Sequence, residues 1–254
     1  MTIVYLPFSK FINMKLLEVT RDEIKGKIGL LPIGSIEQHG PHLPMGTDSI
    51  IAEWVSSRVE ERLKDDVVLF PPIYYGCSKE HTGFPYLGVG YVTMINFLVD
   101  LIKSAERSGL SAVVIVNAHG GNESVLDIVR REINMDLTNC FKVFVFSLVG
   151  KYTIEEVKDY HAGSIETSKI AYINRELVRE LKLKEVKDFT VRDGVFKTIP
   201  TSVANSYGII NLSGEVKIDV ELGKKLLETA VEDLSRFITG EVKGFITSCS
   251  RNGL

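Results

Sequence analysis

The stretch GSIEQHGPHLPMGTD, residues 34–48, concentrates side chains that can bind metal ions directly after an apolar run. It contains the carboxylates of Glu37 and Asp48 and the imidazoles of His39 and His42. Glu37 and His39 are two positions apart, so an extended segment projects both side chains to the same side. The glycines and prolines that follow turn the chain and allow Asp48 to return to the same place. Mixed carboxylate and imidazole ligands suit Zn, Mn or Fe(II).

Asp48 also has a structural interpretation, because together with Thr47 it can cap the helix expected to begin near Ile50. A cap does not account for Glu37 or His39, which would be left as polar groups that need partners beside a buried strand. A metal site accounts for all of these residues, and a carboxylate such as Asp48 can bridge two ions.

The histidines add to this pattern, because all five fall in predicted loops, past strands or ahead of a helix: His39, His42, His81, His119 and His161. His119 lies on the Gly-Gly turn of NAHGGN after a predicted strand and is a natural further ligand. Two divalent ions carry four positive charges, and burying them requires carboxylates nearby. Glu37, Asp48 and Glu166 supply three negative charges. A hydroxide that bridges the ions would supply the fourth and act as the nucleophile, because metal coordination lowers the pKa of water toward about 7.

Short β-branched apolar runs alternate with amphipathic helical stretches, which indicates an α/β fold with a mostly parallel sheet and helices on both faces. The predicted strands are residues 27–33, 67–75, 111–117 and 142–148. The predicted helices are residues 51–63 and 95–105, one after Asn122, and residues 164–181 and 220–237. The segment 182–214 breaks the alternation and is expected to form strands or a flap. In open α/β sheets, ligands bind beyond the carboxyl ends of the strands, which is where the metal-binding motifs lie.

The composition predicts one globular domain over residues 1–254. Of the 254 residues, 44% are hydrophobic and 25% are charged, which suffices for one large core. A net charge of -3 without a dense Lys/Arg tract argues against a nucleic-acid partner. Neither a signal peptide nor an apolar run of transmembrane length is present, so no membrane is expected. The three scattered cysteines favour a reducing compartment over a disulfide framework, and we expect a cytoplasmic protein.

The string LPIGSIEQHGPHLPMGTD, followed by NAHGGN and HAGSIETS, resembles the creatininase (creatinine amidohydrolase) family of metal-dependent amidohydrolases. The three motifs in this order cover most of the chain from Gly26 to about Leu181. The resemblance implies a three-layer α/β/α sandwich and a homo-oligomer. It also implies hydrolysis of a non-peptide amide C–N bond of a small molecule with two divalent metal ions.

The resemblance assigns metal ligands residue by residue. Glu37, Asp48 and His119 would bind one ion, while His39 and the bridging Asp48 would bind the other. Creatininase completes its second site with a glutamate two positions after the histidine of the NxH motif, where this chain has Gly121.

The second site therefore needs another carboxylate, for which Glu166 is the candidate and Glu123 the alternative. His161, which opens HAGSIETS, matches a histidine that handles the proton of the leaving nitrogen, and a pKa near neutrality suits that task. His161 and Glu166 form the predicted catalytic pair.

Two departures from the family bear on the substrate. Creatininase closes its pocket with tryptophans from a segment before the last histidine, whereas the only tryptophan here is Trp54, on a predicted core helix. Creatinine is therefore not the expected substrate. The string GFPYLGVGY, residues 83–91, stands where family members usually read FPGT, so the pocket wall around His81 is expected to differ. Three residues before it either line the pocket or form an ordinary turn: Cys77, Ser78 and Glu80.

Several other functions are weighed against a metal-dependent hydrolase. A serine hydrolase lacks its G-x-S-x-G elbow, and neither GxxxxGK[ST] nor GxGxxG is present. A non-catalytic family member would be a binding or assembly subunit, which has no physical need for a cluster of acids and imidazoles. Within the family, the named alternative is the archaeal 2-amino-5-formylamino-6-ribosylaminopyrimidinone 5'-phosphate deformylase of riboflavin and deazaflavin synthesis. The phosphate of its substrate would meet Lys79, Lys151 or Arg192.

Overall fold

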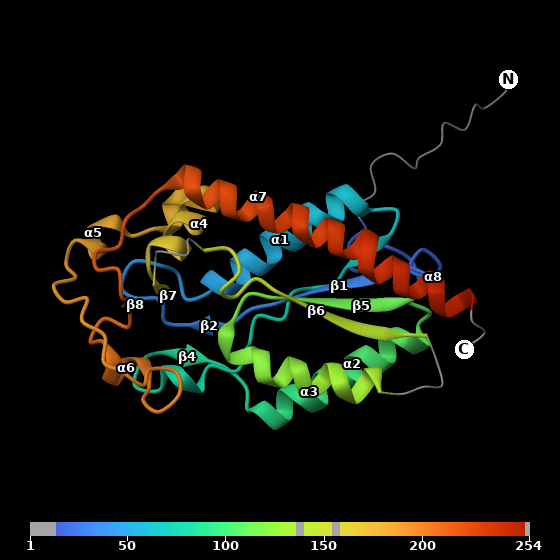
Figure 1. Ribbon diagram of the computed structural model, residues 1–254, viewed down its shortest axis with the longest axis horizontal. Coiled ribbons are helices and arrows are strands. Elements are labelled where there is room, and N and C mark those ends of the chain that lie inside the picture. The colour runs from blue at the N-terminus through green and yellow to red at the C-terminus, as the bar shows by residue number, and fades with distance from the viewer. Residues whose placement is uncertain (1–13, 136–139, 154–157, 252–254) are drawn as a thin grey trace, which may run out of the picture.

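The fold is built on a four-stranded parallel sheet with the strand order β3-β1-β5-β6 (Figure 1). A computed structural model describes residues 14–135, 140–153 and 158–251 of the chain. The strands of this sheet are β1 (Ile28–Ile33), β3 (Val67–Leu69), β5 (Ala112–Asn117) and β6 (Lys142–Ser147). Every residue of β1 and β5 is buried, because helices cover both faces of the parallel sheet. This burial explains why the sequences of both strands are almost continuously apolar.

Two layers of helices enclose the sheet, as Figure 1 shows. One layer contains α1 (Thr47–Leu63), α4 (Ser164–Asn174) and α7 (Val220–Phe237), and the other contains α2 (Tyr91–Arg107) and α3 (Glu123–Asn134). Successive residues of a strand point to opposite faces. Leu30 accordingly packs in the core beneath α1 and α7, while Leu31 packs in the core beneath α2 and α3. The predicted three-layer α/β/α sandwich is confirmed.

Two small antiparallel sheets stand beyond one end of the main sheet (Figure 1). The first pairs β2 (Ile36–Glu37) with β4 (Tyr86–Leu87), and the second pairs β7 (Asp159–His161) with β8 (Ile210–Asn211). The short helical turns are η1 (Lys79–His81), η2 (Gly120–Asn122), η3 (Arg175–Leu177), α5 (Glu180–Leu183) and α6 (Thr201–Ala204). After α7 the chain continues through the π-helical η4 (Ile238–Val242) into α8 (Lys243–Arg251).

Some predicted boundaries are wrong for local reasons. The strand predicted over 67–75 ends at Leu69, because prolines follow at 71 and 72 and proline cannot donate to a strand ladder. The helix predicted over 164–181 ends at Asn174, where the backbone turns extended and the side chain caps η3 by accepting from the Glu176 N–H. In the segment 182–214, the expected strands reduce to β8, beside the short helices α5 and α6.

The prediction that the cysteines would not form disulfides is wrong for two of them. Cys140 and Cys249 form a disulfide that joins the segment before β6 to α8, with 5.7 Å between their Cα atoms. Their sequence separation of 109 residues gives no local signal of the pairing. Cys77 is a free, buried cysteine. No helix in the described part of the chain is both long and apolar enough to cross a membrane.

Removing this disulfide should destabilise the protein strongly. The bond closes a loop across 109 positions, and closing a loop of that size lowers the entropy of the unfolded chain by an amount equivalent to about 5 kcal/mol. We expect Cys249→Ser to lower the free energy of unfolding by about this amount in urea titrations under oxidising conditions. A reducing agent should destabilise the wild type and leave the variant unchanged, whereas equal effects on both would contradict a stabilising bond.

Candidate metal centre

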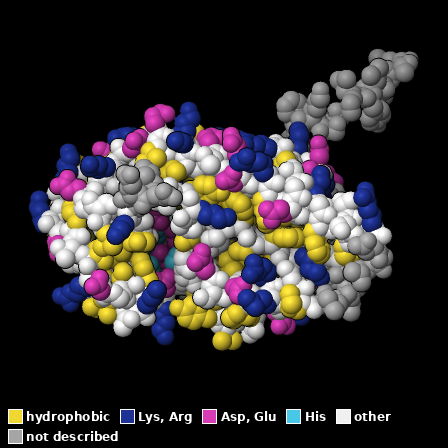
Figure 2. All heavy atoms as spheres, viewed as in Figure 1, with side chains coloured by type: hydrophobic (Ala, Val, Ile, Leu, Met, Phe, Trp, Pro, Cys, Tyr) yellow, Lys and Arg dark blue, Asp and Glu magenta, His cyan; other side chains and the backbone are white. Residues whose placement is uncertain are grey.

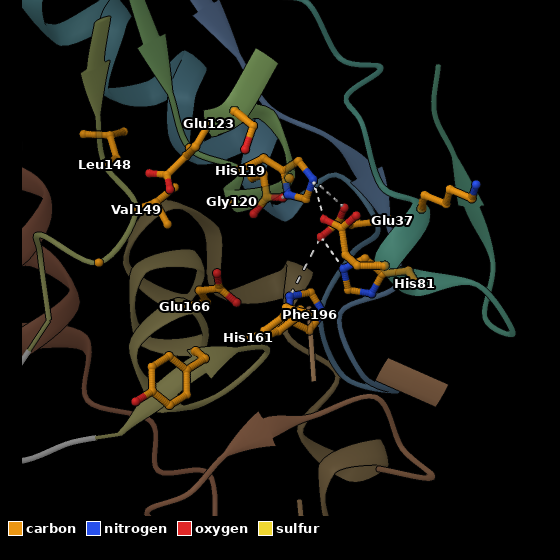
Figure 3. A pocket seen from close by; sticks show the side chains of 18 of the residues that line it. Glu37, His81, His119, Gly120, Glu123, Leu148, Val149, His161, Glu166 and Phe196 are labelled. Carbon is orange, nitrogen blue, oxygen red and sulfur yellow. Dashed lines mark ion pairs between the residues drawn. The ribbon is translucent and has the colours of Figure 1, made fainter. Parts of the chain in front are cut away.

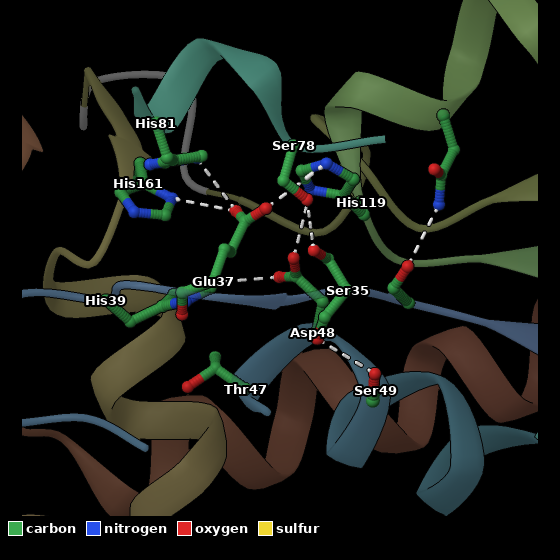
Figure 4. A network of polar contacts seen from close by, with 12 residues as sticks. Ser35, Glu37, His39, Thr47, Asp48, Ser49, Ser78, His81, His119 and His161 are labelled. Atoms are coloured by element: carbon green, nitrogen blue, oxygen red, sulfur yellow. Dashed lines mark hydrogen bonds and ion pairs between the residues drawn. The ribbon is translucent and has the colours of Figure 1, made fainter. Parts of the chain in front are cut away.

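The opening motif folds so that one strand end and one helix start meet. Glu37 ends β2 and Asp48 lies in the first turn of α1. Gly34 makes this approach possible, because a Cβ there would lie 2.4 Å from the backbone of Ser49. The Ser49 hydroxyl donates a hydrogen bond of 2.9 Å to the Ser35 carbonyl and fixes the two segments side by side. Figure 4 shows the Glu37 and Asp48 side chains pointing into the same space.

Asp48 lies between two imidazoles, one on each of its oxygens (Figure 4). Its Oδ1 is 3.2 Å from Nε2 of His39, and its Oδ2 is 3.0 Å from Nδ1 of His119. Glu37 approaches His119 from the other side, with 3.3 Å between Oε2 and Nε2. The structure therefore brings together the four residues that the sequence predicted as the main metal ligands.

The electrostatics of this cluster are those of a cation site. Burial opposes charge on His39, but Asp48, followed by Glu166 and Glu37, more than offsets it and raises the pKa of His39 to about 10. Burial likewise opposes charge on Glu37, yet His119 and His81 lower its pKa to about 2. The carboxylates of Glu37 and Asp48 are thus ionised, and they stabilise protons on the imidazoles as they would stabilise a metal ion.

Two buried oxygens of the cluster have no hydrogen-bond partner: Oε2 of Glu37 and Oδ2 of Asp48. An unpartnered buried oxygen is costly, and such atoms in a native structure call for an explanation. Both face His119, and carboxylates and imidazoles are ligands that Zn, Mn and Fe(II) accept. The residues present therefore fit a divalent ion at this position.

Of the two acids considered for completing the second site, the structure brings Glu166 to the cluster. Its Oε2 lies 3.7 Å from Nε2 of His39, and burial raises its pKa to about 7. His39, His161 and Glu166 form one of the groups in the described residues that could hold an ion. Glu123 is instead exposed, accepts a hydrogen bond from Ser147 and belongs to none of those groups.

His161 ends β7, and a strained residue turns it toward the cluster. Ala162 takes a φ of 54°, which is uncommon outside glycine, and the Glu166 carboxylate accepts its N–H at 2.6 Å. Nε2 of His161 lies 2.8 Å from the Gln38 carbonyl oxygen and 3.0 Å from the Gln38 side-chain nitrogen. Burial, with the nearby charges of His39 and His81, lowers the pKa of His161 well below its usual value.

The sequence analysis placed His81 and Glu80 at the pocket wall and missed their contacts with the cluster. Nε2 of His81 lies 2.9 Å from Oε1 of Glu37 (Figure 3), and Oε1 of Glu80 lies 3.2 Å from Nε2 of His119. Each joins Glu37 in a group that could hold an ion. The available signal was the acid–imidazole pair in SKEH, directly after the second predicted strand.

The neighbours of Glu80 and His81 in the SKEH segment have other roles. Cys77 packs in the core, and Ser78 bonds Ser35. Neither borders the cleft, so only Glu80 of the three proposed lining residues does. His42 lies outside the cluster, where its Nε2 forms a hydrogen bond of 2.9 Å with the Thr167 hydroxyl. Burial and the charge of His39 lower the pKa of His42 to about 4.

A cleft of about 1120 Å³ opens over this cluster (Figure 3). In Figure 2 a hollow on the visible face exposes histidine and acidic side chains. Of the three residues predicted to contact a substrate phosphate, only Lys79 lines the cleft. Lys169 and Lys197 also line it and were not predicted. Lys151 lies over the Phe146 ring, and Trp54 packs against Tyr172 away from the cleft.

The fold and the site define an α/β/α protein with a buried cluster of carboxylates and imidazoles beyond the strand ends. The family model described as creatinine amidohydrolase matches residues 13–238. The chain therefore belongs to the creatininase family.

Individual relatives match different parts of the chain. A mycofactocin precursor peptide peptidase of Mycolicibacterium smegmatis is 44% identical over 102 residues, which are 38% of this chain and 41% of that protein. The chain thus spans less than half of the length of that relative. A 2-amino-5-formylamino-6-ribosylaminopyrimidin-4(3H)-one 5'-monophosphate deformylase of Methanocaldococcus infernus is 29% identical over 252 residues, 94% of this chain and 99% of that protein. The solved structure "Creatininase Mn" superimposes with a TM-score of 0.74 at 23% identity, covering 91% of this chain and 99% of that chain.

Replacing Asp48 should empty the cluster of metal. In Asp48→Asn a neutral amide faces both His39 and His119, and an amide cannot bridge two cations as a carboxylate does. We expect metal analysis after loading and desalting to find both ions lost, while circular dichroism reports an intact fold. Glu123→Gln, which changes an acid of the same cleft outside the cluster, should keep its metal. Wild-type metal content in Asp48→Asn would refute the bridging role.

Proposed function

We propose that this chain is a metal-dependent amidohydrolase that cleaves a non-peptide amide C–N bond of a small molecule at a dinuclear centre. The observation that carries the proposal is Asp48, whose two buried oxygens face His39 and His119 separately. Glu37 and His119 would hold one ion with Asp48, and His39 and Glu166 the other. Solved creatininases include a Mn form and a Zn-Zn type, which supports Zn, Mn or Fe(II) as the ions.

When bound, two divalent ions supply a hydroxide nucleophile near neutral pH and polarise the amide oxygen. The residues of the chain supply the proton transfer. With its hydrogen on Nε2, His161 donates to the Gln38 carbonyl, which leaves the lone pair on Nδ1, 3.8 Å from Glu37. In this tautomer Nδ1 would take the proton of the nucleophile and pass it to the departing nitrogen.

His81 holds Glu37 in place for this reaction. The Gln38 amide is oriented at both ends, because its oxygen accepts from the Gly40 N–H and its nitrogen donates to the Gly208 carbonyl. The same nitrogen lies 3.1 Å from Nδ1 of His81, which must then accept. Nε2 of His81 consequently carries the hydrogen and donates to Glu37. Such outer partners orient the ligands of metal sites.

A second candidate, the ribosylaminopyrimidinone monophosphate deformylase, is favoured by the lysines of the cleft. The relative with this name matches nearly the whole chain. Lys169 lines the cleft at 7% exposure and makes no hydrogen bond or ion pair with any residue in the described ranges. A buried ammonium needs an acceptor, and a phosphate or carboxylate of a substrate would provide one.

The chain is also proposed to form a homo-oligomer. Apolar side chains are exposed along β4 and the start of α2, among them Leu87 at 60% and Val92 at 71%. Exposed apolar residues that cluster in this way mark interaction surfaces, and sedimentation analysis would measure the assembly. The cytoplasmic location stays a prediction. The Cys140–Cys249 disulfide argues against it, because disulfides are rare in reducing compartments.

The function is tested by a proton NMR time course of the Mn-, Zn- or Fe(II)-loaded protein against the formylaminopyrimidine ribotide, creatinine and small amides. We expect amide hydrolysis that a chelator abolishes, with formate released if the ribotide is the substrate. His161→Ala should lower kcat by about 10²–10⁴-fold with metal content retained, because only the proton relay is lost. Full turnover in that variant would remove His161 from the mechanism. If the fully metallated wild type hydrolysed none of these compounds, the result would favour a non-catalytic binding or assembly subunit.

Lys169 should discriminate between charged and neutral substrates. A charge-assisted hydrogen bond to a bound anion contributes about 1.5–3 kcal/mol, so Lys169→Met should raise KM for a phosphate-bearing substrate by about tenfold or more. KM for a neutral amide should not change. Lys151→Met, which removes a lysine that lies over the Phe146 ring and outside the cleft, is the matched control. An equal rise of KM for both substrates in Lys169→Met would mean that the lysine shapes the site without binding the anion.

A further inference from the structure

The two ring nitrogens of His119 have different surroundings. Nδ1 lies 3.0 Å from Oδ2 of Asp48, but that oxygen has no hydrogen-bond partner, so the contact is not a hydrogen bond. Nε2 lies 3.0 Å from the carbonyl oxygen of Cys77, in hydrogen-bonding geometry, 3.2 Å from Oε1 of Glu80 and 3.3 Å from Oε2 of Glu37. Nδ1 therefore faces one carboxylate oxygen, whereas Nε2 faces three acceptors, of which the Cys77 carbonyl and Glu80 lie outside the predicted ligand set.

We propose that Glu80 and the Cys77 carbonyl form a clamp on the Nε2–H of His119, which leaves Nδ1 bare to bind the ion beside Asp48. This inference rests on the proposed function, because it concerns how a ligand of that metal centre is prepared. Glu80 is in this view a positioning residue and does not itself touch the ion. Metal-binding histidines commonly donate their other ring N–H to a carboxylate or a backbone carbonyl.

Gly121 provides independent support for the clamp. A Cβ at this position would lie 2.1 Å from the Cys77 carbonyl oxygen, 2.2 Å from Oε1 of Glu80 and 2.5 Å from Nε2 of His119. Any side chain at 121 would thus occupy the space in which the clamp contacts the imidazole. The absence of a side chain there, which leaves the NAHGGN motif without an acid of its own, makes room for the carboxylate of Glu80.

Glu80 is also placed as a dedicated partner of His119. Its side chain is only 14% exposed, and the contact with His119 is its one ion pair among the described residues. Burying a carboxylate is costly unless it is paired. Glu123, in the same cleft, is instead exposed and accepts from Ser147. The two glutamates therefore form a matched pair for mutation.

The clamp matters because a neutral imidazole carries one hydrogen, and the nitrogen that binds a metal must be the other one. Asp48 also attracts that hydrogen, since its Oδ2 faces Nδ1. A hydrogen on Nδ1 would block the ligand position and would pair with the oxygen that the ion needs. Two acceptors at Nε2 bias the equilibrium toward the tautomer that can bind the ion.

The clamp is tested by measuring the Zn dissociation constant in competition with a chelator. We expect Glu80→Ala to bind Zn about 10–100-fold more weakly than wild type, the loss usual for an orienting partner. Glu80→Gln should recover part of that loss, because its amide oxygen still accepts the N–H. Glu123→Gln should bind as wild type. A Glu80→Ala affinity within twofold of wild type, or a Gln variant as weak as the Ala variant, would overturn the positioning role.

Long-range ¹H–¹⁵N spectra of the histidine rings show which ring nitrogen carries the hydrogen. A purely structural role of Glu80 would not change that result. In the Zn-loaded wild type, we expect His119 to show a hydrogen on Nε2 and a metal-bound Nδ1. The opposite tautomer would overturn the clamp even if Glu80→Ala weakened binding. A wild type that binds no ion would refute the proposed function separately. The clamp would then be tested on the metal-free rings, where a slowly exchanging Nε2–H should be lost in Glu80→Ala and kept in Glu123→Gln.

Discussion

The repulsion among three converging carboxylates is the constraint on which the rest of the site depends. Glu37 and Asp48 are buried and Glu166 is partly buried beside them, so bringing them together is costly unless positive charge accompanies them. Without metal, protons on His39 and His119 provide that charge, which is why the pKa of both imidazoles rises despite burial. An ion that replaces those protons would meet carboxylates of Glu37 and Asp48 that are already gathered and ionised.

The fold gathers these ligands by using elements that are rigid for other reasons. Glu37 follows β1 and His119 follows β5, which are neighbouring strands fully buried in the sheet. Asp48 arrives on α1 because Gly34 lets the helix start against the strand end. The ligand positions are therefore fixed by the packing of the core, and a loop alone would not hold them so closely.

The sequence predicted the contacts within one short motif better than the contacts between segments that are far apart in the chain. Glu37, His39 and Asp48 share one short motif, so spacing and turn residues predicted their convergence, and the parallel sheet brought His119 to them. Glu80 was not predicted as a partner of His119 because its contact depends on how two loops pack. The Cys140–Cys249 pair depends likewise on where α8 ends. The helix predicted over 164–181 forms but ends early, because the side chain of Asn174 caps the following turn and so favours a break in the helix despite the apolar periodicity.

The substrate must be selected by groups other than those that bind the metal. Proteins named as a peptidase, a deformylase and a creatininase all resemble this chain, so amides of very different size and charge are handled on related scaffolds. The cleft wall can differ without disturbing the centre, because its lysines and aromatic residues stand on segments outside the strand ends. Lys169 is the exception, since it lies on α4 one turn after Glu166. The same helix thus presents a candidate metal ligand and a candidate substrate contact, which couples where the amide sits to where its charged group is held.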